Sequence, residues 1–147
     1  MTVKFKAVVI DNQNDKFSRE VKELDTSHLK DGNVLIKIDY SSLNYKDALI
    51  LNDGGKIVRK FPFIPGIDFS GKVIESEDER FKKDESVICT GFRVGEVYYG
   101  GFSQYAKVDS NFLIKNPKGI DTEKSMMLGT AGFTALQCSF AIKAREE

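Results

Sequence analysis

The segment SSLNYKDALI at residues 41–50 gathers polar side chains into a short stretch that follows an apolar strand pattern. Asn44 can donate and accept hydrogen bonds, Tyr45 carries a phenol that donates to an oxygen, and Asp47 can accept from backbone amides. The three lie within one helical turn of each other, so one site can use them together. The residues alone leave two interpretations open. One is a solvated turn that opens a short helix, with Tyr45 in the core; the other is the edge of an active site.

Further polar residues lie inside apolar surroundings. Asp68, in PGIDFSG, opens a strand pattern, and burying a carboxylate there is costly unless it accepts hydrogen bonds. We therefore expect Asp68 to be a structural acceptor. Thr130 and Thr134 are four residues apart and share one face of a helix. His28, in DTSHLKDG, is expected to be an exposed loop residue.

Gly129 and Gly132 fall near the start of a helical pattern. Each costs about 1 kcal/mol relative to alanine in a helix interior, so a compensating reason is expected. Either a ligand or another backbone approaches closely, or the helix packs tightly on a sheet; the spacing leaves both open. Neither GxGxxG nor GxxxxGK[ST] occurs in the chain, so it carries no phosphate-binding fingerprint of its own.

Alternation of apolar and polar residues predicts the elements that position these side chains. The predicted strands are residues 3–10, 33–42, 68–76, 85–92 and 100–108. A short helix is expected near residues 44–51. Pro62 and Pro65 exclude a helix from the segment FPFIPGID that ends at Asp68. This pattern predicts a mainly β chain, folded as a compact antiparallel barrel or sandwich.

The last thirty residues differ in character. After Asp121, which can cap a helix, the run MMLGTAGFTALQCSFAI is apolar almost all round. A helix of this kind is usually buried on every side, whereas a small β-domain can cover only one of its faces. We therefore expect missing neighbours, supplied by another subunit or by the rest of a longer protein.

Composition narrows the function classes. The chain has 147 residues, with 22 basic and 22 acidic side chains, which is the size of one domain with no net charge. Nucleic acid and anionic membranes are therefore not expected as partners. The basic clusters Lys56–Arg59–Lys60 and Lys82–Lys83 are interpreted as solvated faces. We expect no secretory leader, and no apolar run long enough to span a membrane.

The soft metal ligands are few. Cys89 and Cys138 lie far apart, and His28 is the one histidine, so a structural zinc site is not expected. Two lone thiols fit a reducing cytosol better than a disulfide framework.

Four motifs, SSLNYKDA, FPFIPGIDFSGKV, GGFSQYAKV and GTAGFTA, occur in an order and spacing that resemble the N-terminal half of the medium-chain dehydrogenase/reductase superfamily. Within it, the chain is most similar to the zinc-free bacterial quinone oxidoreductases that include acrylyl-CoA reductase. The resemblance covers essentially the whole chain. It implies a GroES-like, partly open barrel over residues 1–120 as the catalytic domain. Residues 121–147 would be the linking helix and the start of a Rossmann domain that binds the cofactor.

The resemblance also implies a chemistry. Zinc-dependent relatives place their metal ligands at positions matching Asn44, Ile67 and Thr130, none of which is a zinc-binding residue type here. A zinc-free reductase would use NADPH as hydride donor. Its acceptor would be an α,β-unsaturated carbonyl compound, such as the enoyl thioester acrylyl-CoA, or a quinone.

The resemblance also implies roles for individual residues. Tyr45 is expected to contact the cofactor and to donate a hydrogen bond, since a phenol with a pKa near 10 stays protonated at neutral pH. Asn44 is expected to position cofactor and substrate beside it. Thr134 and Thr130 match positions that contact the nicotinamide ring. Asp47 is expected to be architectural first and catalytic second.

The cofactor would be held mostly by the domain that follows. This chain alone should therefore bind NADPH weakly and turn over nothing. Its apolar C-terminal helix should favour a homo-oligomer, and we expect a cytoplasmic location. The alternative is a stand-alone GroES-like binding or assembly module without catalysis.

Overall fold

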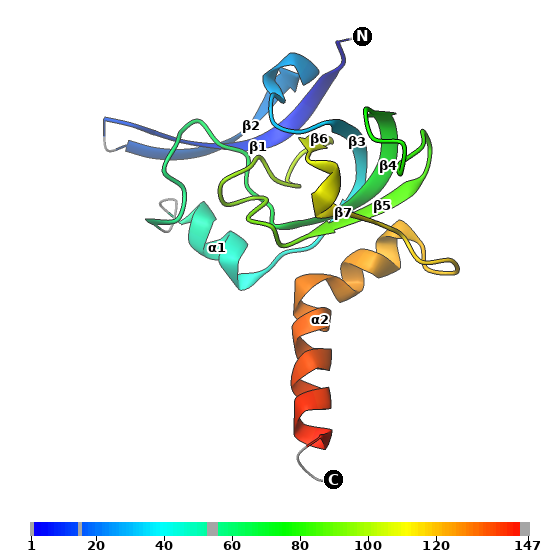
Figure 1. Ribbon diagram of the computed structural model, residues 1–147. Helices are drawn as coiled ribbons and strands as arrows, with labels where there is room; N and C mark the ends of the chain where they lie inside the picture. Colours follow the sequence, from blue (N-terminus) through cyan, green and yellow to red (C-terminus); the bar gives the residue numbers. More distant parts are fainter. Residues whose placement is uncertain (1, 15, 53–55, 145–147) are drawn as a thin grey trace.

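The computed structural model describes residues 2–14, 16–52 and 56–144. Within these ranges, seven strands and two α-helices follow one another (Figure 1). The strands are β1 (Lys4–Gln13), β2 (Lys16–Asp25), β3 (Val34–Ser41), β4 (Asp68–Ser76), β5 (Ser86–Thr90), β6 (Tyr105–Val108) and β7 (Leu113–Lys115). The helices are α1 (Tyr45–Leu51) and α2 (Thr122–Lys143), with 3-10 turns at Thr26–His28 and Ser110–Phe112.

All strand pairs are antiparallel and form two open sheets. One is the five-stranded sheet in the order β6-β3-β4-β5-β7, and the other is the two-stranded ribbon β1–β2. Isolated bridges from Ala7 to Ser103 and from Ile10 to Phe63 attach the ribbon to the body. The predicted mainly β, partly open barrel with one short helix and a C-terminal helix is confirmed.

The core lies where the alternating pattern predicted it. Inward-facing residues of the five-stranded sheet are fully or almost fully buried, and they include Val34, Ile36, Phe69, Val73 and Val87. Period-two alternation holds only in part, because Leu35 in β3 and both neighbours of Phe69 in β4, Asp68 and Ser70, are buried as well. The start of β4 is therefore enclosed on both sides of the sheet.

Two strands were not predicted. The strand β2, KFSREVKELD, is half-exposed to exposed along its length, and its Val21 is 69% exposed. Its apolar residues do not alternate, because a two-stranded ribbon packs only part of its length on the body. The three-residue β7 is too short to produce a pattern.

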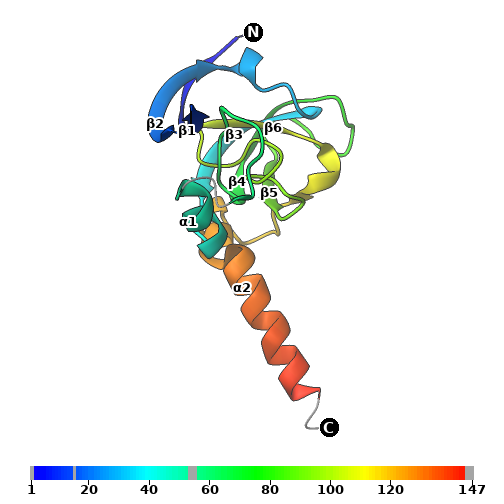
Figure 2. The ribbon, with the colours of Figure 1, turned by 90° about the vertical axis from the view of Figure 1, so that its left-hand side faces the viewer.

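The C-terminal run is not one continuous helix. At Gly129 the backbone leaves the helical region, with φ 48° and ψ −157°, and α2 bends sharply there (Figures 1 and 2). The predicted C-terminal helix is therefore present but is interrupted by a kink at this residue, which the sequence did not predict. The first part packs on the sheet through Ser125 and Met126, and the second part projects from the body.

Beyond the bend, apolar side chains point into solvent. Phe133, Leu136, Phe140 and Ile142 are each more than half exposed, as expected for a helix that lacks its neighbours. By length and composition alone, α2 is long and apolar enough to cross a membrane, so the expectation that no run was long enough is wrong. Core helices of soluble proteins meet the same criteria. The straight part after Gly129 is about 21 Å long, whereas a bilayer core is about 30 Å thick.

Candidate functional site

The site is organised around the carboxylate of Asp68, the first residue of β4, which is completely buried. Its Oδ2 accepts hydrogen bonds from Ser42 Oγ at 2.8 Å and from Asn44 Nδ2 at 3.1 Å. The Thr130 backbone amide donates to the same oxygen at 2.7 Å, and Thr130 Oγ1 donates to Oδ1 at 2.6 Å. Asp68 is thus the structural acceptor that its sequence context predicted, and it joins three separate segments of the chain.

The glycine at the bend is required by this carboxylate. A Cβ on Gly129 would lie 2.8 Å from Asp68 Oδ2 and 3.0 Å from Ser42 Oγ, and the positive φ disfavours any side chain. The close approach at Gly129 is therefore made by side chains of the same chain, and neither interpretation of the sequence had included them. Gly132 differs, because a Cβ there would meet only Leu128 of its own helix, at 3.3 Å.

Asp47 is also completely buried, at the third position of α1. Its Oδ2 accepts from the Asn44 amide at 2.8 Å and its Oδ1 from the Ile67 amide at 2.9 Å. Burial raises the pKa of Asp47 above its usual 3.8, while the amide hydrogen bonds oppose that rise. Asp47 therefore fixes the start of α1 against the segment that enters β4. These contacts are those of a positioning residue, and a catalytic role for Asp47 stays a prediction.

The predicted cofactor contacts lie on the surface above this network. Tyr45, the first residue of α1, is 80% exposed, and its hydroxyl has no hydrogen-bond partner among the described residues. Thr134 is exposed and its Oγ1 donates to the Thr130 carbonyl at 2.8 Å. Tyr45 and Thr134 thus present polar atoms to solvent, whereas the Thr130 hydroxyl proton is used inside the protein.

The three positions matching zinc ligands are brought into one region. Asn44 and Thr130 both donate to Asp68, and Ile67 is buried beside it in the chain. Neutral donors around one carboxylate are suited to holding that carboxylate, and they do not form the thiolate or imidazole set that zinc prefers. In the described ranges, no three His, Cys, Asp or Glu residues lie together in a way that could hold a metal ion.

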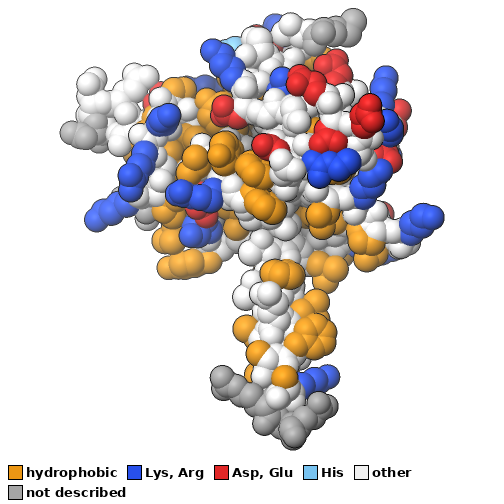
Figure 3. Space-filling model, viewed as in Figure 1, with side chains coloured by type: hydrophobic (Ala, Val, Ile, Leu, Met, Phe, Trp, Pro, Cys, Tyr) orange, Lys and Arg blue, Asp and Glu red, His pale blue; other side chains and the backbone are white. Residues whose placement is uncertain are grey.

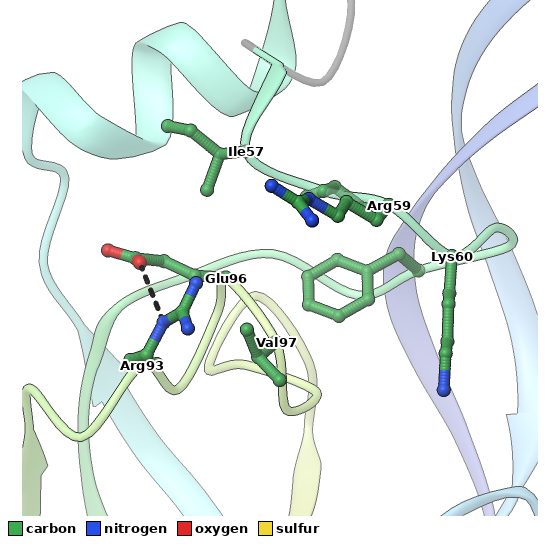
Figure 4. Close-up of a pocket in the computed structure, with 8 residues that line it drawn as sticks. Ile57, Arg59, Lys60, Arg93, Glu96 and Val97 are labelled. Atoms are coloured by element: carbon green, nitrogen blue, oxygen red, sulfur yellow. Dashed lines mark ion pairs between the residues drawn. The ribbon is translucent and has the colours of Figure 1, made fainter.

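A cavity beside α1 was not predicted. Its volume is about 300 Å³, and Figure 4 shows Arg59, Arg93 and Glu96 at its edge. Arg59 and Lys60 are exposed, as expected for a solvated face, but they also line this cavity. Ser42 was missed as well. The cavity and the role of Ser42 have no signal in the sequence, because both depend on contacts between segments that are far apart in the chain.

Known proteins resemble this chain over nearly its full length. It is 46% identical over 137 residues to the probable acrylyl-CoA reductase AcuI of Escherichia coli, covering 93% of this chain and 42% of that protein. It is 42% identical to the putative quinone oxidoreductase YhfP of Bacillus subtilis, covering 92% of this chain and 41% of the relative. The yhdH oxidoreductase of Salmonella enterica, solved in complex with NADP, matches with a TM-score of 0.90 and 43% identity, over 95% of this chain and 43% of that chain.

The chain spans less than half the length of these relatives. The profile of the alcohol dehydrogenase GroES-like domain matches residues 30–118, the region that contains both Asp47 and Asp68. A match over more than half of the chain, together with the open antiparallel fold and the four motifs, identifies its family. The chain belongs to the alcohol dehydrogenase GroES-like domain family, within the medium-chain dehydrogenase/reductase superfamily.

Proposed function

We propose that this chain is the catalytic domain of a zinc-independent, NADPH-dependent reductase that acts on an α,β-unsaturated carbonyl compound, in the first place an enoyl thioester such as acrylyl-CoA. The observation that carries the proposal is the Asp68-centred network, which fixes Asn44 and the bend of α2 beneath an exposed Tyr45. The 46% identity to a probable acrylyl-CoA reductase and the likeness to an oxidoreductase solved with NADP support it.

The proposed division of the chain lies at the start of α2, eight residues before Gly129. Residues 1–120 form the catalytic domain, and residues 121–147 form the linking helix and the start of the cofactor-binding domain. In support, the second part of α2 has few contacts with the body, and its apolar side chains need a cover. Most of the contacts with NADPH would come from that following domain.

The exposed atoms fit a nicotinamide ring and a carbonyl substrate. Asn44 donates from its Nδ2 to Ser42 Oγ and Asp68 Oδ2, and its side chain also caps α1, so the protein holds it in a fixed orientation next to Tyr45. Thr134 commits its hydroxyl proton to the Thr130 carbonyl, so its exposed oxygen acts as an acceptor. Asp47 holds the start of α1 and positions Tyr45 without touching the ligand.

Bound NADPH would supply the hydride that reaches the β-carbon of the substrate. As that bond forms, negative charge develops on the carbonyl oxygen, and a donor placed in advance stabilises it. The Tyr45 phenol is the proposed donor. A proton from solvent would then add to the α-carbon and complete the reduction of the double bond.

A quinone is the second candidate acceptor, favoured by the 42% identity to a putative quinone oxidoreductase. Steady-state rates of the full-length protein with acrylyl-CoA and with a simple quinone separate the two. A non-catalytic binding module is the remaining alternative, and it predicts no NADPH oxidation with either compound.

The primary test is titration calorimetry with NADPH. It compares this chain with a version extended through the next Gly-rich motif of the coding sequence. Binding by the extended protein alone supports a catalytic domain that depends on its neighbour. Absence of binding by both proteins contradicts the proposal and favours the binding module.

We also propose that this chain self-associates in the cytoplasm through α2. The support is its exposed apolar row, which includes Phe133, Leu136 and Phe140. Sedimentation velocity of the wild type and of a Phe133→Gln, Phe140→Gln variant tests it. A monomeric wild type at tens of micromolar contradicts self-association.

A further inference from the structure

A cavity of about 300 Å³ lies between the segment that follows α1 and the turn at residues 93–97. Its apolar lining includes Val58 and Phe63, which are 7% and 3% exposed. In Figure 4, Arg59 and Arg93 approach the same opening from different segments, whereas the Lys60 amine extends away from them. In Figure 3, Lys and Arg side chains stand beside hydrophobic ones on the α1 side of the body. The cavity thus combines an apolar floor with a cationic edge.

The charges around the cavity are not balanced. Arg59, Lys60 and Arg93 are its cations, and Glu96 is the one acid among the described residues that line it. Glu96 is shared already, because Arg93 Nε lies 3.8 Å from its Oε2 and Lys46 Nζ lies 3.5 Å from its Oε1. The excess of positive charge favours an anion. Guanidinium groups favour phosphate in particular, because they can donate two parallel hydrogen bonds to it.

The backbone around the cavity is held in an unusual conformation. Lys56, Phe92 and Arg93 have φ values of 56°, 53° and 62°. Elsewhere in the described ranges, positive φ at non-glycine residues is confined to Asn14 and Asp84, which are residue types that tolerate it. Such conformations cost free energy and cluster where a structure presents a side chain to a ligand. Here they set the direction in which Arg93 leaves the backbone.

The cavity adjoins the site described above. Lys46, which pairs with Glu96, follows Tyr45 directly in α1. On the other side, the turn packs against the segment that leads into β4, since a Cβ on Gly95 would lie 2.5 Å from the Gly66 carbonyl carbon. A long ligand could therefore reach from the cavity to the Tyr45 surface.

From these observations we infer that the Arg59–Arg93 cavity binds a phosphate group of the substrate's carrier, the phosphorylated nucleotide end of a coenzyme A thioester. This inference rests on the proposed function and adds a recognition site to it. The phosphates of coenzyme A lie at the other end of the pantetheine arm from the acyl group, so they bind in a part of the site separate from the reacting carbons. Binding there contributes to holding the acyl group in place at Tyr45.

The direct test uses titration calorimetry with coenzyme A, pantetheine and inorganic phosphate on the wild-type chain and on R59Q/R93Q. Losing two charged donors should weaken coenzyme A binding about tenfold or more. Pantetheine, which lacks the phosphates, should bind both proteins equally and weakly. The control K83Q removes one positive charge at an exposed turn away from the cavity and should bind coenzyme A like the wild type. Circular dichroism checks that all three proteins are folded.

A further arm separates the substrate's phosphate from that of the cofactor. If adenosine 2′,5′-bisphosphate, which carries the phosphate of NADPH, competes with coenzyme A more strongly than adenosine 3′,5′-bisphosphate, which carries the phosphates of coenzyme A, and is equally weakened in R59Q/R93Q, the cavity holds the cofactor and the inference is overturned. It is also overturned if wild type and R59Q/R93Q bind coenzyme A alike, or if the wild type does not bind it at millimolar concentration.

Activity of the full-length protein distinguishes this inference from the proposed function. A KM for acrylyl-CoA that rises about tenfold in R59Q/R93Q with kcat preserved supports both. Unchanged kinetics in the variant would leave the reductase in place and remove the cavity from it. Coenzyme A binding that depends on the two arginines, without any reduction of acrylyl-CoA, would instead preserve the cavity and contradict the proposed reaction.

Discussion

Asp68 Oδ1 lies 2.6 Å from Thr130 Oγ1, although 62 residues separate the two along the chain. The same carboxylate also accepts a hydrogen bond from the backbone amide of Thr130, the residue directly after the bend of α2. One buried side chain therefore connects the sheet to the C-terminal helix and fixes where that helix turns.

Replacing this carboxylate should destabilise the fold. In Asp68→Asn an amide NH₂ faces groups that donate, so at least one buried donor loses its acceptor, at a cost of about 2–3 kcal/mol. The measurement is the free energy of unfolding by urea denaturation. Asp31→Asn, at an exposed position, is the matched control and should stay within about 0.5 kcal/mol of the wild type. Equal losses in the two variants would contradict the role given to Asp68.

The two glycines of α2 should respond differently to alanine. Gly129→Ala places a Cβ 2.8 Å from Asp68 Oδ2 at a φ of 48°, and should cost about 2 kcal/mol or more. In Gly132→Ala the helical preference of alanine opposes a 3.3 Å approach to Leu128 Cβ, so the change should be within about 1 kcal/mol. Urea denaturation of both variants decides it; a harmless Gly129→Ala would mean that the bend is not enforced.

The raised pKa of Asp47 predicts a pH dependence. A carboxyl that holds its proton more tightly when folded contributes stability below pH 3.8, and that contribution is lost as pH rises through the folded pKa. The free energy of unfolding of the wild type minus that of Asp47→Asn should therefore fall as pH increases over this window. Taking the difference between the two proteins cancels the pH-dependent contributions of acids whose pKa is lowered, such as Glu85 and Asp121. A difference that is flat or rises with pH would show that the amide hydrogen bonds outweigh burial.

Tyr45 can be tested with the fold intact, because it is 80% exposed. In the full-length protein, Tyr45→Phe should lower kcat about 10- to 100-fold if the phenol stabilises charge that develops in the transition state. Its melting temperature should be unchanged. Tyr40→Phe, the same change at an exposed tyrosine of β3, is the matched control and should leave kcat unchanged. A loss confined to the KM for NADPH would assign Tyr45 to cofactor binding alone.

The two thiols should differ in reactivity. Burial raises the pKa of Cys89 to about 12, whereas Cys138 is exposed on the second part of α2. At pH 8 iodoacetamide should modify one thiol of the native chain, and Cys138→Ser should abolish that rapid reaction. Mass spectrometry of peptides identifies the site. If Cys138 is protected in the extended protein or at high chain concentration, the cover of α2 is located directly.

The strands that the sequence predicted correctly, and α1, each bury apolar side chains in one or more of three hydrophobic clusters. The strand β5 alternates throughout, whereas β3 and β4 alternate only in part, and α1 begins after an Asn with an Asp at its third position. The strand β2 has no buried residue, so its pattern is that of a solvated segment.

The candidate site was predictable only in part. The sequence singled out Asn44, Asp68 and Thr130 separately, but their common contact depends on the path of the whole chain. The bend at Gly129 was hidden for the same reason, because a glycine in a helical pattern does not show which neighbour excludes its Cβ. The Arg59–Arg93 cavity depends on backbone conformations that no spacing rule encodes.

The bend of α2 makes its second part a lever arm with its pivot at Gly129. A rotation of about 5° at that pivot would move the far end of a ~21 Å helix by about 2 Å. In the proposed reductase α2 would join the two halves of the site, where misplacement of reacting groups by about 1 Å can cost a hundredfold in rate, so that reductase requires a pivot stiffer than an ordinary helical glycine. The hydrogen bonds that Asp68 accepts from Thr130 supply that stiffness, because they restrain the chain directly at the pivot.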